Sequence, residues 1–229
     1  MNNHSFGCDF GSYHLKIYNR DADGYLMQHN MVAVQDKNKL LACGDEAYAM
    51  YEKAPANIHV GAPMSYGNLA SISNMQAFLK KLLEENIKGQ LKGADFFVAL
   101  PTDMQERNFT MLIQDSAMKP KTVYLVDKPV AAGLGLGINV KEAQGVLIVD
   151  IRAETTEISV LSLGGTVISR LIQTGGRSID DAIQSAIRKE YSFFIGSKTA
   201  ENIKKELAYA IDPEEKTMQI CGRNMVVGL

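Results

Sequence analysis

Two aspartates, Asp9 and Asp150, each end a short apolar run and are followed by a polar turn and a second strand-like run. A strand that delivers a carboxylate to a tight hairpin places it beside backbone N–H groups that cradle phosphate, while the carboxylate reaches a divalent cation through water. Asp9 and Asp150 are therefore candidate metal-site residues. Two copies of this unit predict two half-sites that close on one nucleotide, with the two aspartates facing each other across a cleft.

The first aspartate belongs to a predicted meander of strands. A strand over 13–18 follows it, then a turn at 21–24 and a single apolar run over 25–34. Residues 60–69 are rich in Gly, Pro, Ser and Asn, which predicts a loop.

An amphipathic helix is predicted next, because apolar residues recur at i, i+3, i+4, i+7 and i+8, at Met75, Phe78, Leu79, Leu82 and Leu83. Ser73 with Gln76 resembles a capping box at its start. A short buried strand over 96–100 ends at Pro101, and Thr102 is predicted to cap a helix that ends near Ala117.

The second half of the chain repeats this organisation. A strand over 122–126 leads into a helix of small residues over 130–136. The second meander spans 146–172, with its hairpin turn at Gly164-Gly165, and helices over 178–191 and 199–210 follow. Two meanders, each followed by helices, predict an α/β protein with two related lobes.

Composition narrows the class of protein. The chain has 229 residues and a formal net charge of −2, which gives no electrostatic case for binding nucleic acid. Three widely spaced cysteines without a CxxC pair indicate reduced thiols, and no apolar run approaches the ~20 residues of a membrane span. These features favour a cytoplasmic protein.

Two glycine-containing motifs do not carry the nucleotide prediction. Residues 133–137 resemble a dinucleotide fingerprint, but Ile138 replaces its third glycine and the run does not open a helix. Residues 196–199 resemble the end of a P-loop, but the lysine does not follow a glycine. The four histidines have no spacing that argues for a metal.

The two hairpins and the segments between them resemble the actin-like ATPase superfamily, and most closely the MreB family of bacterial actin homologues. The matching segments run in order from about residue 5 to the last residue, and they include residues 9–12, 44–47, 98–101, 129–132, 150–157 and 175–183. The resemblance implies an α/β fold of duplicated actin-like (ribonuclease H-like) lobes. The first lobe would span 1–140 with a small insert around 35–70, and an incomplete second lobe would span 141–229.

The resemblance also implies the ligand and its contacts. The cofactors would be ATP and Mg²⁺, with weak binding, and the binding residues would be Gly11, Ser12, Tyr13, His14, Lys16, Thr155, Thr156, Gly175, Gly176, Glu201, Lys204 and Lys205. Ser12, His14 and Lys16 share parity on one predicted strand, which would place them on one face and aim Lys16 at a phosphate. The alternative is that Lys16 is a plain surface lysine.

The sequence departs from the family at three places, and the first of them puts hydrolysis in doubt. Lys128 stands where the family has its catalytic carboxylate, and an ammonium cannot accept a proton from water. The neighbouring Asp127 is expected to cap the helix. Residues 152–154 replace a glycine-rich phosphate turn, and either Arg152 offsets the repulsion between Glu154 and phosphate or both are solvated turn residues. The family also continues beyond the matched segment, so the sequence is a fragment or a shortened paralogue.

Three functions follow from the resemblance. The first is a cytoskeletal protein that binds ATP and assembles into filaments governing cell shape, with weak or absent hydrolysis and with cell-wall or division machinery as partners. The second is a non-hydrolysing scaffold or binding module. The third is a sugar-kinase-type or chaperone-type ATPase, which lacks support because the sequence shows no insertion suited to a small substrate. Membrane contact is not evident from the sequence, and membrane association stays an open alternative.

Overall fold

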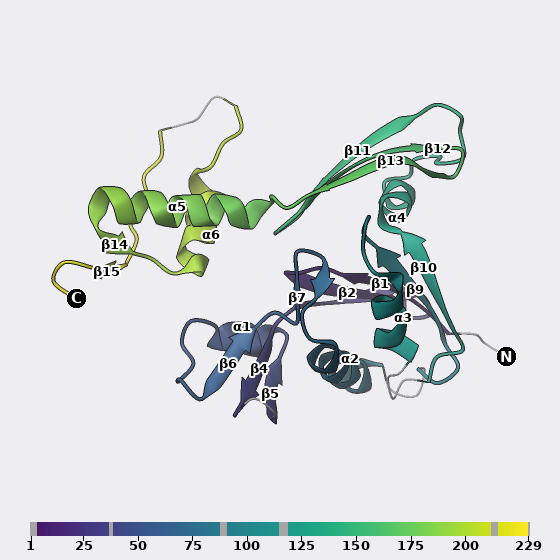
Figure 1. The fold of residues 1–229 in the computed structure, drawn as a ribbon, viewed down its shortest axis with the longest axis horizontal. Coiled ribbons are helices and arrows are strands. Elements are labelled where there is room, and N and C mark those ends of the chain that lie inside the picture. Colours follow the sequence, from purple (N-terminus) through teal and green to yellow (C-terminus); the bar gives the residue numbers. More distant parts are fainter. Residues whose placement is uncertain (1–3, 37–38, 88–90, 115–118, 212–214, 229) are drawn as a thin grey trace. The chain divides into compact units, whose positions relative to one another are not determined.

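The structure, a computed structural model, describes residues 4–36, 39–87, 91–114, 119–211 and 215–228 (Figure 1). The chain divides into two compact units. Unit 1 comprises Met1–Asp150 and Thr155–Gln173, and unit 2 comprises Ile151–Glu154 and Thr174–Leu229. The boundary between two lobes near residue 140 stays a prediction.

Unit 1 is built on a five-stranded sheet whose spatial order is β10 (Thr122–Asp127), β9 (Asp95–Leu100), β1 (Ser5–Phe10), β2 (His14–Asn19) and β3 (Gly24–His29). The pairs β1–β9 and β9–β10 are parallel, whereas β1–β2 and β2–β3 are antiparallel. Successive side chains of a strand point to opposite faces. Phe6, Cys8 and Phe10 therefore enter the core, while Asp9 lies on the other face.

Two helices bury their apolar sides in this core: α2 (Ile72–Asn86) and α3 (Glu106–Gln114). The predicted stripe on α2 is confirmed, since all five of its residues are buried. The predicted cap at Ser73 is wrong. Ser71 is the N-cap, because its hydroxyl accepts a hydrogen bond from the Asn74 N–H at 3.4 Å and the helix begins one residue later.

The second face of the sheet carries a row of side chains that crosses all five strands. The strand register aligns Tyr124, Phe97, Gly7, Tyr18 and Tyr25, and the four aromatic members are exposed. The adjacent row contains Val126, Ala99, Asp9, Lys16 and Met27. Asp9 and Lys16 are thus direct neighbours in the middle of a largely apolar face.

A small insert has its own sheet, in the order β5 (Lys39–Cys43), β4 (Val32–Gln35) and β6 (Ile58–Gly61), and carries α1 (Asp45–Met50). The predicted single run over 25–34 is wrong, because the chain leaves the first sheet at Asn30. The predicted loop over 60–69 is also wrong, since it contains the end of β6 and the short pair β7 (Met64–Ser65) and β8 (Asn68–Leu69).

The remaining sheet of unit 1 consists of β11 (Val146–Ile151), β12 (Thr156–Ser162) and β13 (Gly165–Ile172), which contact α4 (Lys128–Gly135) through β12 and β13 (Figure 1). The hairpin turn is one residue earlier than predicted. Leu163 and Gly164 have φ values of 52° and 83°, and left-handed residues at both central positions match the twist of a two-residue hairpin.

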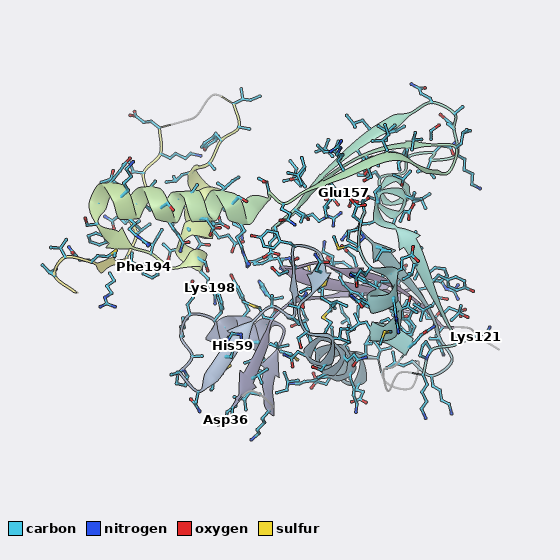
Figure 2. All side chains as sticks on the ribbon, in the orientation of Figure 1. Asp36, His59, Lys121, Glu157, Phe194 and Lys198 are labelled. Carbon is cyan, nitrogen blue, oxygen red and sulfur yellow. The ribbon has the colours of Figure 1, made fainter. Side chains whose placement is uncertain are left out.

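Glu157 on β12, labelled in Figure 2, ties this sheet to the end of β9. Its side chain is 2% exposed, and its Oε1 accepts a hydrogen bond from the Thr102 N–H at 2.8 Å. The Thr102 hydroxyl donates to Ser169 Oγ at 2.7 Å. Thr102 does not cap a helix as predicted, because these contacts hold it away from α3, which begins at Glu106. The predicted helix end near Ala117 lies outside the described residues.

Unit 2 pairs the helices α5 (Gly176–Tyr191) and α6 (Ser197–Leu207), with the short strands β14 (Phe193–Phe194) and β15 (Arg223–Asn224). Phe194 and Lys198, labelled in Figure 2, lie in β14 and in the first turn of α6. Both helices begin two residues before their predicted starts, and α6 ends at Leu207 because Ala208 is extended. Among the described residues, no helix is long and apolar enough to cross a membrane.

Candidate functional site

The first aspartate hairpin is a tight turn that requires glycine. The Gly11 N–H donates to the His14 carbonyl at 3.0 Å, and a Cβ on Gly11 would lie 2.8 Å from that same oxygen. Asn30, which is fully buried, holds the turn from the side. Its side-chain amide donates to the Gly11 carbonyl at 2.7 Å, and its backbone N–H donates to the Tyr13 carbonyl at 2.8 Å. The turn is therefore fixed before any ligand binds.

Four charged residues predicted to matter line one cavity of ≈ 540 Å³ in unit 1, namely Asp9, Lys16, Lys128 and Asp150. Asp9 and Lys16 are register partners on β1 and β2. Lys128 begins α4, and Asp150 is near the end of β11. The structure thus brings Asp9 and Asp150 to the same cavity, while their role as metal-site residues stays a prediction.

Lys128 makes the contact that changes the chemistry of this cavity. The residue is only 6% exposed, and its ammonium donates a hydrogen bond to Asp9 Oδ1 in an ion pair. Asp127, the residue before it, occupies the N-cap position of α4 but makes no side-chain cap hydrogen bond, so its predicted capping role is wrong. The Thr166 hydroxyl lies 3.5 Å from the Asp127 carboxylate instead.

Ser12, Tyr13 and His14 point to partners in the insert and at the end of β3. The Ser12 hydroxyl accepts from the Gly67 N–H at 3.2 Å, and the Tyr13 and Tyr48 hydroxyls lie 3.1 Å apart. The ring of His14 lies 4.8 Å from that of His29. The argument from strand parity fails for Ser12, because β2 begins at His14 and Ser12 belongs to the turn. His14 and Lys16 do share a face of β2.

The second hairpin contradicts one of the two interpretations of Glu154, and the other, in which Arg152 offsets its repulsion of phosphate, stays a prediction. The side chain of Glu154 is 4% exposed, so it is not a solvated turn residue, and the Arg177 guanidinium neutralises it at 2.7 Å. Arg152 and Ala153 direct their carbonyls to the start of α5, where the Gly176 and Arg177 N–H groups donate to them at 2.8 and 2.7 Å. The turn therefore uses the helix N-terminus as its own hydrogen-bond partner.

The predicted adenosine-side residues of unit 2 are engaged with one another. The Lys204 ammonium donates to the Gly176 carbonyl at 3.0 Å and pairs with Asp180 at 2.7 Å. Lys205 pairs with Glu201 at 2.7 Å, one helical turn away on α6. Gly175 is packed tightly against the 152–153 turn, where a Cβ would lie 2.4 Å from the Arg152 carbonyl oxygen.

Thr155 and Thr156 lie at the start of β12, in unit 1. Thr155 is buried and Thr156 is half-buried. Whether they contact phosphate stays a prediction.

Cys8 is next to Asp9 but does not add a reactive group to the cavity. Burial raises the pKa of the Cys8 thiol above its usual range, and the charge of Asp9 raises that pKa further. The thiol therefore stays protonated and unreactive at neutral pH. Across the described part of the chain, no group of three or more His, Cys, Asp or Glu side chains could hold a metal ion.

From the sequence, Glu157 and Asp180 match the family only as parts of longer segments, and a positioning role was predicted neither for them nor for Asn30 and Arg177. The sequence does contain a signal for Arg177 and Asp180. Both follow Gly175-Gly176 within the first turns of a predicted helix, and their charges are opposite to those of Glu154 and Lys204, two residues already singled out from the sequence. Asn30 and Glu157 act through contacts with residues 19 and 55 positions away, and no local pattern indicates these.

The fold and the two aspartate hairpins place the chain in the actin-like class. Its structure superposes on that of MreB5 of Spiroplasma citri bound to AMPPNP with a TM-score of 0.92 and 30% sequence identity, covering 100% of this chain and 70% of that chain. The ADP-bound form of MreB5 gives a TM-score of 0.91 with the same coverage. A MamK double helical filament gives 0.76 at 20% identity, covering 93% of this chain and 68% of that chain, a likeness of fold alone.

Within that class, the chain belongs to the MreB/Mbl family. The sequence profile described as MreB/Mbl protein matches residues 3–229. The chain is 33% identical to the cell shape-determining protein Mbl of Bacillus subtilis (strain 168) over 229 residues, covering 97% of this chain and 68% of Mbl. It is 31% identical to the cell shape-determining protein MreB of Escherichia coli (strain K12) over 241 residues, covering 100% of this chain and 69% of that MreB.

Proposed function

We propose that the chain binds ATP at the cavity formed by its first aspartate hairpin, α4 and the end of β11. The observation that carries the proposal is the convergence of Asp9, Lys16, Lys128 and Asp150 on that one cavity. The two MreB5 structures that the chain resembles were determined with AMPPNP and with ADP, which supports a nucleotide as the ligand. Lys16 supplies an exposed ammonium for phosphate.

The proposal extends to assembly and biological role. Membership of the MreB/Mbl family supports self-association into filaments that act in determining cell shape, as the names of the Mbl and MreB relatives indicate for those proteins. A cytoplasmic location, a filament under the membrane and cell-wall or division proteins as partners belong to the same proposal. The magnesium ion stays a sequence-based prediction, against which the contact between Lys128 and Asp9 argues.

Hydrolysis is proposed to be near background. A positioned general base contributes ~10²–10⁴-fold to rate. Lys128 occupies the position of the family's catalytic carboxylate, and its ammonium, paired with Asp9, has no lone pair with which to accept a proton from water. The chemistry that this cavity supports is therefore binding without efficient turnover.

A second candidate function, a non-hydrolysing scaffold, is favoured by a specific observation in unit 2. The pair Glu154–Arg177 and the two hydrogen bonds from the start of α5 satisfy the second hairpin internally. A turn that is complete without phosphate needs no nucleotide to fold. The scaffold would then present a fixed surface in every nucleotide state.

The test combines nucleotide titration, phosphate release and electron microscopy of the purified chain. We expect ATP to bind weakly, with a dissociation constant in the upper micromolar range or poorer, about −5 kcal/mol, phosphate release at background, and filaments that form with ATP. Lys16→Met should abolish binding. Filaments that form equally without nucleotide would favour the scaffold. Hydrolysis that Lys128→Ala abolishes, or tight stoichiometric capture of ATP, would overturn the proposal.

A further inference from the structure

The ion pair between Lys128 and Asp9 joins two elements that are far apart in sequence. Asp9 is in β1 and Lys128 begins α4, 119 residues later. The lysine side chain is 7% exposed and the aspartate side chain is 35% exposed, so the carboxylate faces the cavity while the ammonium is enclosed beside it. A buried ammonium needs a charged partner. Asp9 supplies that partner from within the chain.

A divalent cation does not fit beside Asp9 in this arrangement. Mg²⁺ demands near-ideal octahedral geometry and usually keeps several of its waters. Here an ammonium already donates to Asp9 Oδ1 and places a positive charge where the cation shell would lie. The ammonium of Lys128 and a divalent cation bound to the same carboxylate would be close together, and like charges repel strongly at short distance where water is partly excluded. The residues present thus disagree with the metal predicted from Asp9 and Asp150.

The charges around the cavity support the same conclusion. Its charged lining residues, within the described part of the chain, are two carboxylates, Asp9 and Asp150, and two ammonium groups, Lys16 and Lys128. These four formal charges cancel. A carboxylate at position 128 would instead leave a net negative cavity, which attracts a divalent cation and repels a nucleotide that lacks one.

We propose that the Lys128 ammonium takes the place of the divalent cation, so that the cavity binds the nucleotide without a metal. Lys128 neutralises Asp9, and Lys16, the register partner of Asp9, presents its ammonium to the phosphates. The ligand is the metal-free nucleoside triphosphate anion. This inference rests on the proposed nucleotide-binding function and specifies the form of nucleotide that the same cavity takes.

The experiment measures binding of a fluorescent ATP analogue to the full chain by anisotropy, once in millimolar MgCl₂ and once in EDTA. The dissociation constants of the unchanged chain should agree within about twofold. Lys128→Met removes the charge but keeps the length of the side chain. Its binding in EDTA should weaken about tenfold or more, the size expected on losing a charged hydrogen-bond partner, and MgCl₂ should restore part of the loss. Lys121→Met, at an exposed lysine that does not line the cavity, is the matched control and should bind as the unchanged chain does.

Each outcome decides a separate point. Binding by the unchanged chain only in MgCl₂ would overturn the metal-free inference and leave the proposed function standing. The absence of binding in both buffers would overturn both. If Lys128→Met binds equally well in the two buffers, the role of Lys128 is refuted. If that variant does not fold, as circular dichroism would show, the comparison of the two buffers with the unchanged chain still decides whether a metal is needed.

Discussion

Gly175 offers a sharp test of how the second hairpin is held. A methyl group at this position would lie 2.4 Å from the Arg152 carbonyl oxygen and 2.8 Å from the Ala153 carbonyl carbon. It would have to move roughly 1 Å to reach the ordinary contact distance of about 3.5 Å. Both close atoms are backbone, so neither can rotate away. Gly175→Ala must therefore displace the turn or the start of α5.

The cost follows from the bonds that join these two segments. The Gly176 and Arg177 N–H groups donate to the Arg152 and Ala153 carbonyls at 2.8 and 2.7 Å, and a 1 Å displacement breaks both. Two such bonds contribute about 2 kcal/mol and overpacking costs about 1–3 kcal/mol, so after partial relaxation we expect Gly175→Ala to destabilise unit 2 by about 2–4 kcal/mol.

Hydrogen exchange measured by mass spectrometry on the peptide containing the start of α5 reports this loss directly. Protection of its amides should fall about 30- to 1,000-fold in Gly175→Ala. Gly165→Ala is the matched control, since a Cβ there meets nothing within 4 Å, and it should change stability by less than about 0.5 kcal/mol. Unchanged protection in Gly175→Ala would refute the packing argument.

Two further predictions concern unit 1. Glu157→Ala should lower the free energy of unfolding by about 2–3 kcal/mol in urea titrations, because the N–H of the half-buried Thr102 loses a charged acceptor at 2.8 Å. Glu157→Gln, which keeps the size of the side chain and an acceptor oxygen, should lose less; an equal loss in Glu157→Gln would contradict the argument from the lost acceptor. Burial raises the pKa of Asp45. The hydrogen bonds from the His29 ring at 2.6 Å and from the His29 backbone N–H at 3.1 Å lower this pKa by more than burial raises it, so the net shift is downward. The advantage of the unchanged chain over Asp45→Asn, below about 1 kcal/mol for this exposed pair, should be constant above about pH 5 and disappear as pH falls below about 4; an advantage that grows on acidification would contradict it.

The sequence predicted those elements whose apolar pattern is local. The apolar stripe on α2 identified the buried side of that helix without reference to the rest of the chain, because the 3.6-residue periodicity of a helix is visible within the segment itself. Boundaries were less predictable where a distant partner decides them. Ser71 and Ser73 are equally good caps by residue type, and only Ser71 is the N-cap. Thr102 is also a good cap by type, but its N–H and its hydroxyl are bonded to Glu157 and Ser169, which hold it away from α3.

The candidate site shows the same division. Asp9 and Lys128 were each singled out from the sequence, the first from its hairpin and the second as a departure from a family pattern. Their pairing was not predicted, because nothing local in either segment indicates that β1 and the start of α4 meet. The signal available was chemical: a lysine that replaces a carboxylate near a predicted metal-binding aspartate has an opposite charge within reach.

The ion pairs of unit 2 decide which lysine a ligand would meet. Lys204 and Asp180 have side chains that are 20% and 12% exposed, and breaking such a partly buried pair costs at most as much as breaking a fully buried one, about 3–5 kcal/mol. Lys205 is 61% exposed, and its pair with Glu201 on the helix surface contributes about 1 kcal/mol at most. A nucleotide that recruits Lys204 would lose much of its affinity in separating that lysine from Asp180. We therefore expect Lys204 to position Gly176 and α5, and Lys205 to be the lysine that a bound nucleotide engages at little cost; contact of either lysine with a nucleotide stays a prediction.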